Sequence, residues 1–213
     1  MSDETNPVIV VNQERSSVAL VAKRIVQACF LLWVTPRLLS CWVSSLVWGR
    51  NRAFLMASEA ISRVPGMRGI YSRQAFYRVL LSECGRDVYF GWQSVFSMRE
   101  ASVADNAYIG RRCSVGYARI GANVMLADGV QVLSGGREHG ISEQSGVAHQ
   151  IQAQTFSEVT IRDGAWIGTN AVVMASVGKG SIIGAGAVVN KPVPDHTVAA
   201  GVPARKIRQI EPQ

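Results

Sequence analysis

The sequence is poor in the residues that most often bind metals or form disulfide frameworks. It has three histidines and four cysteines in 213 residues, and the cysteines show neither a close pair nor a metal-type spacing. They are Cys29, Cys41, Cys84 and Cys113. Two of them lie in apolar segments, so we expect reduced, buried thiols in a cytoplasmic protein rather than disulfides.

The sequence also lacks the patterns of nucleic-acid-binding, exported and membrane-spanning chains. It contains no zinc-finger spacing, no RNP-type aromatic motif and no long run of Lys and Arg, so no nucleic acid is expected as a partner. Residues 1–15 are polar, which does not fit a cleavable signal peptide. No stretch reaches the roughly 20 apolar residues of a membrane-spanning helix, because Pro36 and Arg37 interrupt the most apolar segment.

A net charge of +7 suggests an anionic partner, such as a phosphorylated cofactor or an acidic membrane surface. Residues 1–16 are predicted to form a flexible tail, and residues 17–87 an α-helical region. Within residues 17–50 we expect two short apolar helices that meet at Pro36. The tryptophans and cations in and just after this stretch are typical of a membrane-interface anchor. They are Trp33, Trp42, Trp48, Lys23, Arg24, Arg37, Arg50 and Arg52.

The alternative for this stretch is that its helices pack on the rest of the protein or on a neighbouring subunit. Two more helices are predicted at residues 51–63 and 71–83, separated by Pro65, Gly66 and Gly69. Residues 88–98 alternate well enough to be the first strands of the next region.

That next region has an aliphatic residue at every sixth position, in two blocks with a shorter step inside each block. The positions are Val103, Ile109, Val115, Ile120, Leu126, Val132, Ile161, Ile167, Val173, Val177, Ile183 and Val189. Neither a helix nor a flat strand has a six-residue period. A coil with three short sides of six residues does, and it points one aliphatic side chain inward on each side.

Glycine and small residues fit the same coil. Six of the twelve aliphatic positions are followed directly by Gly, which can adopt the backbone angles of a sharp corner. Four residues after an aliphatic position the side chain is usually small, as at Ala107, Cys113 and Ala165. The sequence therefore predicts a β-helix over residues 88–198, interrupted by a loop at 135–158 without the repeat, and a C-terminal tail at 199–213.

The repeat, the loop with its histidine, the triplet WIG at 166–168 and the ending VVNKPVPDHTVAAGVPARKIR at 188–208 resemble the hexapeptide-repeat acyltransferases. The resemblance is to their sugar O-acetyltransferase branch and covers about residues 88–210. It implies a mainly β fold, a left-handed parallel β-helix, here with an α-helical N-terminal region. It also implies a homotrimer that binds acetyl-CoA in clefts between its subunits, without a metal.

The chemistry of this family needs a base that takes the hydroxyl proton while the oxygen attacks the thioester. A neutral imidazole suits that role near pH 7, and no Ser-His-acid arrangement is recognisable, so we expect direct transfer. The resemblance makes His139 the catalytic base, because it lies where the family's histidine emerges from the coil. His149 in the same loop is the alternative, and His196 is expected to be structural.

CoA carries phosphates that call for cations and backbone N–H groups. Matching the family's ending position by position implies a set of cofactor-binding residues. They are Trp166, Thr169, Ala185, Asn190, Lys191, Arg205 and Arg208. The alternatives are that the cations are solvated surface charges and that Trp166 only caps the coil.

The resemblance thus implies an O-acetyltransferase that acts on a hydroxyl of a sugar or glycan precursor, which could be lipid-linked, as in polysaccharide biosynthesis. The enzyme would be cytoplasmic and membrane-associated as a peripheral protein on the cytoplasmic face of the inner membrane, through residues 17–50. The alternatives are transfer of a longer acyl chain, N-acylation of an amino sugar, and a non-catalytic β-helix scaffold. A γ-type carbonic anhydrase, built on the same coil, needs three zinc-binding histidines, and the positions of the three present here do not suit it.

Overall fold

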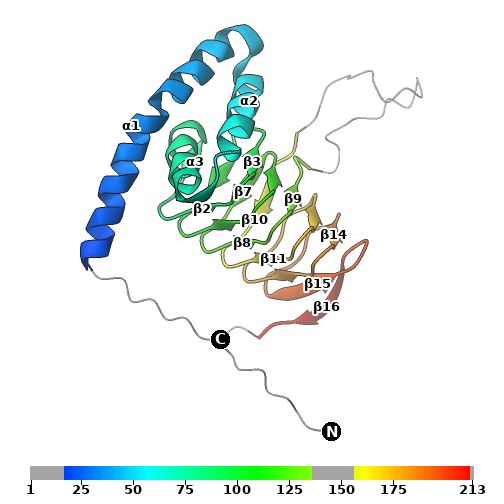
Figure 1. Cartoon of the computed structure of the whole chain (residues 1–213). Coiled ribbons are helices and arrows are strands. Elements are labelled where there is room, and N and C mark those ends of the chain that lie inside the picture. The colour runs from blue at the N-terminus through cyan, green and yellow to red at the C-terminus, as the bar shows by residue number, and fades with distance from the viewer. Residues whose placement is uncertain (1–16, 136–155, 212–213) are drawn as a thin grey trace, which may run out of the picture.

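The chain folds into three helices followed by a β-helix of stacked coils (Figure 1). The computed structural model describes residues 17–135 and 156–211, with side chains from residue 21 onward. The predicted N-terminal tail and most of the predicted loop at 135–158 therefore lie outside the described residues.

The first helix, α1 (Ser17–Trp48), is a single helix that continues through Pro36, so the prediction of two helices meeting there was wrong. A proline inside a helix costs about 3 kcal/mol, because it removes one backbone hydrogen bond. Val34 and Cys41, on either side of Pro36, are both buried, and α1 packs against α2 and α3. Packing on both sides of the proline keeps the helix continuous.

Helix α2 (Arg50–Ser62) lies close to its predicted position, but α3 (Gly66–Leu80) begins five residues before the predicted start. Gly69, predicted to lie in the break between helices, is inside α3. A Cβ at Gly69 would lie 1.9 Å from the carbonyl oxygen of Val64. The glycine is therefore present because the preceding loop packs directly on the helix backbone, and not because the chain turns there.

Short parallel strands form the three faces of the β-helix. Sheet A contains β1 (Glu83–Cys84), β4 (Ser102–Val103), β7 (Ala118–Ile120) and β10 (Val159–Ile161). Sheet B contains β2 (Tyr89–Phe90), β5 (Tyr108–Ile109), β8 (Met125–Leu126), β11 (Trp166–Ile167), β13 (Ile182–Ile183), β15 (Thr197–Ala200) and β16 (Arg205–Gln209). Sheet C contains β3 (Val95–Phe96), β6 (Ser114–Val115), β9 (Gln131–Val132), β12 (Val172–Val173) and β14 (Val188–Val189). The last strand, β16, turns back and pairs antiparallel with β15.

The twelve aliphatic positions of the repeat are the core of the coil. Each is at most 1% exposed, and partners in neighbouring coils lie in register, as Ile109 does with Leu126 and Leu126 with Ile167. The small residues predicted to share the interior, such as Ala107, Cys113 and Ala165, are buried as well. The predicted β-helix is therefore confirmed down to which side chains point inward.

Aromatic side chains close the end of the β-helix from which the helices come. Tyr77 of α3 is fully buried between Phe90 and Phe96 of the first coil, with ring centroids 4.7 and 4.9 Å away. Its hydroxyl lies 2.8 Å from the Ser58 hydroxyl and donates to the Ser94 carbonyl oxygen. Helices α2 and α3 thus fill the open cross-section of the first coil with a ring that is also hydrogen-bonded there.

Replacing Tyr77 with Phe tests how much these hydrogen bonds stabilise the junction. We expect Tyr77→Phe to lower the free energy of unfolding by about 1–3 kcal/mol, because it removes one buried partner of the Ser58 hydroxyl and one of the Ser94 carbonyl oxygen. Chemical unfolding followed by circular dichroism measures the change. The half-buried Tyr117 makes no hydroxyl hydrogen bond among the described residues, so Tyr117→Phe is the matched control. Equal effects of the two variants would contradict this account.

Candidate active site

Two of the predicted cofactor residues lie at the edge between sheets B and C. Thr169 and Ala185 follow β11 and β13, and both side chains are exposed. The Gly186 N–H donates to the Thr169 carbonyl oxygen at 2.8 Å, which stacks the two corners in neighbouring coils. A Cβ at Gly168 would lie 2.5 Å from the Ala185 nitrogen, so glycine allows these corners to approach closely.

Asn190 and Lys191 lie at the opposite edge of sheet C, where the chain passes from β14 toward sheet A. Both are exposed. The predicted loop leaves the coil at this same edge, after β9, two coils earlier. At its base the Ser157 N–H donates to the Ser134 carbonyl oxygen at 2.9 Å, so the chain departs and returns at one corner.

Arg205 and Arg208 are exposed residues of β16, beyond the last complete coil. The Ala204 N–H donates to the Val188 carbonyl oxygen of β14, which places Arg205 beside the end of sheet C. Arg205 also pairs in register with Ala200 of β15, and the Ala200 Cβ lies directly against the backbone at Gly184, in the corner after β13. Within residues 17–135 and 156–211, Lys191 and both arginines form no ion pair, so their charges remain available to an anion.

Trp166 lies on the outer side of sheet B and is about half exposed, so it does not cap the coil. It belongs to a column of apolar side chains in register up this sheet. The members are Tyr89, Tyr108, Met125, Trp166, Ile182 and Val198. The rings of Tyr89 and Tyr108 stack with centroids 4.6 Å apart. The sequence analysis missed this column, although the sequence contains a signal for it. Each of these apolar residues immediately precedes an inward-facing position, and neighbouring residues of a strand point to opposite faces, so each must face outward.

The predicted base His139 and the alternative His149 both lie outside the described residues. His196 is described and supports the turn before β15. Its backbone has a positive φ of 52°, its N–H donates to the Lys179 carbonyl oxygen, and its own carbonyl accepts from Ile210. Within the described parts of the chain, no three His, Cys, Asp or Glu side chains gather as metal ligands would.

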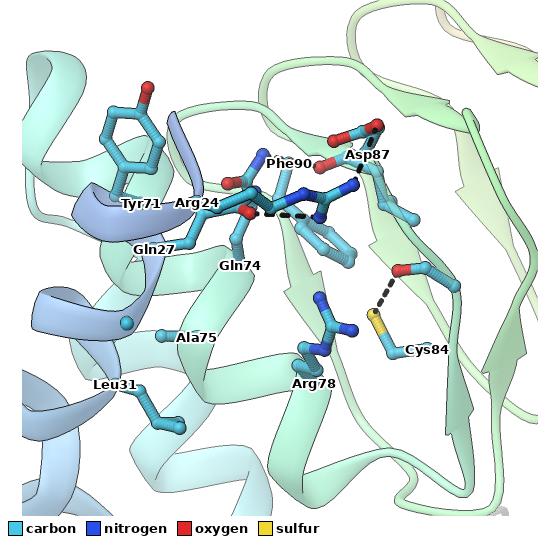
Figure 2. Close-up of a pocket in the computed structure, with 13 residues that line it drawn as sticks. Arg24, Gln27, Leu31, Tyr71, Gln74, Ala75, Arg78, Cys84, Asp87 and Phe90 are labelled. Atoms are coloured by element: carbon cyan, nitrogen blue, oxygen red, sulfur yellow. Dashed lines mark hydrogen bonds and ion pairs between the residues drawn. The ribbon is translucent and has the colours of Figure 1, made fainter. Parts of the chain in front are cut away.

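A pocket of about 260 Å³ that the sequence did not predict lies between α1, α3 and the first coil (Figure 2). Its apolar part is formed by Ala28, Leu31 and Phe90 among others. Figure 2 shows Arg24 reaching from α1 toward Asp87, with which it forms a 3.9 Å ion pair, and Arg78 extending from α3 toward the same space.

The Cys84 thiol lines this pocket and is not activated as a nucleophile. Burial raises the pKa of the Cys84 thiol to about 11, against a smaller lowering effect of Arg78, so the thiol stays neutral near pH 7. The described lining includes no histidine that could activate the thiol. The predicted cofactor residues lie in the last coils, at the other end of the β-helix (Figure 1).

Comparisons with known proteins place this geometry in a family. No protein-family model matches the chain. A serine acetyltransferase of Bacillus pumilus is 39% identical over 163 residues, which cover 71% of this chain and 68% of the relative. The galactoside O-acetyltransferase of Escherichia coli is 32% identical over 121 residues, covering 51% of this chain and 57% of the relative.

Solved structures give the same fold. A maltose O-acetyltransferase from Clostridium difficile superposes with a TM-score of 0.66 at 27% identity, covering 76% of this chain and 88% of that one. A hexapeptide-repeat acetyltransferase from Vibrio cholerae, solved with acetyl coenzyme A, has a TM-score of 0.55 at 18% identity, covering 79% and 92%.

The coil is therefore a left-handed parallel β-helix, the fold of a class of acetyltransferases. The chain belongs to the hexapeptide-repeat acetyltransferase family. It spans between 35% and 57% of the length of three curated relatives, from Schizosaccharomyces pombe, Salmonella typhimurium and Escherichia coli.

The raised thiol pKa predicts which cysteines react at mildly alkaline pH. At pH 8 a thiol with a pKa of about 11 is ionised to roughly one part in a thousand, so Cys84 and Cys113 should resist iodoacetamide. The exposed Cys29 should be alkylated first, and labelling of Cys84 should rise as the pH approaches 11. Peptide mass spectrometry measures the order.

Cys29→Ser is the control for this experiment, because it should remove the fast labelling and leave the slow labelling unchanged. Alkylation of Cys84 as fast as that of Cys29 at pH 8 would contradict the assigned burial.

Proposed function

We propose that the chain transfers an acetyl group from acetyl-CoA to a hydroxyl of a sugar or glycan precursor. The observation that carries the proposal is the gathering of the predicted cofactor residues around sheet C in the last coils. Thr169, Ala185 and Arg205 lie at one edge, and Asn190 and Lys191 at the other. The galactoside and maltose O-acetyltransferases among the similar proteins support a sugar hydroxyl as the acceptor.

In this proposal the acetyl donor lies along sheet C with its phosphates toward the cations. Arg205, Arg208 and Lys191 supply positive charge, and the corners at Thr169 and Ala185 supply backbone groups for the pantetheine arm. Trp166 supplies an apolar wall from the neighbouring face. The structure of the Vibrio cholerae relative with acetyl coenzyme A supports the choice of donor.

His139 is the general base of the proposed reaction. In the sequence it follows Gly135, the last described residue before the loop, by four positions, and the chain leaves the coil at the edge of sheet C where Asn190 lies two coils later. A neutral imidazole takes the proton of the acceptor hydroxyl as its oxygen attacks the thioester carbonyl. The tetrahedral intermediate then collapses, and the CoA thiolate leaves.

The active form is a homotrimer in which subunits meet through the apolar column of sheet B. Tyr108, Met125 and Trp166 are between 37% and 48% exposed, and apolar patches of this kind on soluble proteins usually mark contact sites. A cleft between subunits would bring the column of one copy beside sheet C of the next. Exclusion of water from that cleft would strengthen the contacts of the cations with the phosphates.

We also propose that the protein is cytoplasmic and contacts the cytoplasmic face of the inner membrane through residues 17–50. Pro36 and Arg37 do not interrupt α1 as the sequence predicted, and by length and composition its stretch Val21–Trp48 could cross a membrane; only 11% of its most apolar window is buried. A lipid-linked glycan would then be a natural acceptor.

A second candidate acceptor is the hydroxyl of serine, because the Bacillus pumilus relative at 39% identity is a serine acetyltransferase. The donor and the base would be the same, and only the pocket for the acceptor would differ. Offering serine and simple sugars in parallel, with acetyl-CoA and longer acyl donors, identifies both substrates by which thioester is consumed.

Replacing His139 tests the base. We expect His139→Ala to lower kcat by roughly 100-fold to 10,000-fold, the usual contribution of a general base, while the particle mass stays at three times 23.1 kDa. Thiol release from acetyl-CoA and light scattering measure the two quantities. His149→Ala is the matched control and should keep most of the activity. Near-normal turnover of the His139 variant would remove the assignment and make His149 the next choice.

Charge reversal at Arg205 tests the phosphate contact. Arg205→Glu should raise the KM for acetyl-CoA about tenfold or more with little change in kcat, because a charge-assisted hydrogen bond is lost in the ground state and transition state alike. Steady-state kinetics measure both constants. The control is Arg162→Glu, an exposed arginine of the coil outside the proposed site. A fall in kcat with an unchanged KM would contradict a binding role.

A further inference from the structure

The outward side of α1 is apolar and carries no charge. Val21, Ile25, Leu32, Leu39 and Val43 are 56–77% exposed and recur at helical spacing. We call them the outer face of α1. In Figure 1, α2 and α3 lie along one side of α1, and no other described helix or strand covers the opposite side. In a surface helix of a water-soluble protein, the exposed side would be the polar one.

The inner side of α1 holds the helix to the protein. Phe30 stacks on Tyr71 of α3 with centroids 5.4 Å apart, Val34 and Cys41 are buried, and Lys23 forms an ion pair with Asp87. Crossing a bilayer would break these contacts and bring Lys23 into the hydrocarbon region. Lying on a membrane surface would preserve them and bury only the outer face.

Three arginines gather on the side of α1 that faces α2 and α3. Arg37 of α1, Arg63 after α2 and Arg68 in the first turn of α3 line a pocket of about 500 Å³, with Ala60, Val64 and Pro65 between them. We call it the arginine pocket. Among the described residues, none of these three arginines has an acidic partner, although six other ion pairs use acids elsewhere. Three converging like charges without a counter-ion favour an anionic ligand.

Trp33 connects the arginine pocket to the outer face. Its ring is 65% exposed on α1, and the Arg68 guanidinium carbon lies 5.8 Å from the ring centroid. Tryptophan at the border between an apolar face and cations is the arrangement that the membrane interface favours. The outer face, Trp33 and the arginine pocket thus succeed one another around α1, from its apolar side to the side that packs on α2 and α3.

From this surface we propose that the arginine pocket binds the phosphate of an anionic phospholipid headgroup while the outer face of α1 enters the acyl region of the same leaflet. Arginine forks match phosphate oxygens in pairs, and the pocket is wide enough for one headgroup. The proposal rests on the membrane contact proposed above and is independent of acyl transfer. A second copy of the chain is a poorer occupant, because a symmetric contact would bring arginine pockets face to face.

The test is sedimentation of the full chain with vesicles of phosphatidylcholine alone or mixed with phosphatidylglycerol. We expect the chain to bind the anionic vesicles more strongly. The triple variant R37Q/R63Q/R68Q should bind them at least tenfold more weakly, since each arginine at an anionic surface raises the partition coefficient about fivefold. The matched control is R86Q/R119Q/R162Q, which removes the same charge from exposed coil arginines. It should keep most of the preference, and circular dichroism checks that both variants fold.

Equal losses in the two triple variants would overturn the proposal, because they would show a general charge effect and no site. The outer face has its own variant, L32N/L39N, which should lose binding to both kinds of vesicle. Inorganic phosphate tests whether the arginine pocket binds free phosphate instead of a lipid headgroup. If it binds the wild type and not the pocket variant while vesicles bind neither, the lipid assignment is wrong. Acetyl transfer to a water-soluble acceptor, measured separately, reports failure of the proposed function independently.

Discussion

The whole molecule depends on how its coils stack. On each of its three sides, every coil buries one aliphatic side chain against the coil before it. Most strands are only two residues long, so none could persist without its neighbours in the ladder. Each buried Val, Ile or Leu contributes roughly 1.5–3 kcal/mol. Because a coil contacts only the coils next to it, the structure is stable as a stack and must be closed at both ends.

The two ends of the stack are closed in different ways. At the start, Tyr77 of α3 fills the first coil and hydrogen-bonds inside it, which ties the helical region to the β-helix. At the other end, β16 folds back on β15 and its side chains remain exposed. The first end therefore has an apolar, rigid junction with helices, and the second has exposed arginines, Arg205 and Arg208, next to the last corners.

The sequence predicted the coil well and the helices less well, for a physical reason. A six-residue period is imposed by contacts between adjacent coils, so it is visible in the residues themselves, and all twelve positions that it named are buried. The continuity of α1 through Pro36 and the place of Gly69 inside α3 depend on packing between helices, which local signals do not encode. Likewise, Thr169 and Ala185 were predicted from a resemblance, whereas the convergence of Arg37, Arg63 and Arg68 arises only in the folded chain.

The distance between the two ends constrains what the proposed enzyme could modify. Five strand spacings separate β2, next to the helices, from β15, next to the cofactor residues, which is about 24 Å. That span belongs to the phosphate end of the proposed donor. The chain leaves the coil toward the proposed base after β9, which is only two strand spacings, about 10 Å, from β3 beside the helices. In the proposed arrangement the donor therefore runs from its phosphates at the far end of the coil back toward the helical end. If α1 lies on a membrane, the acceptor hydroxyl would then react on the side of the coil nearer to the membrane, which keeps a lipid-linked glycan within the proposed acceptor class.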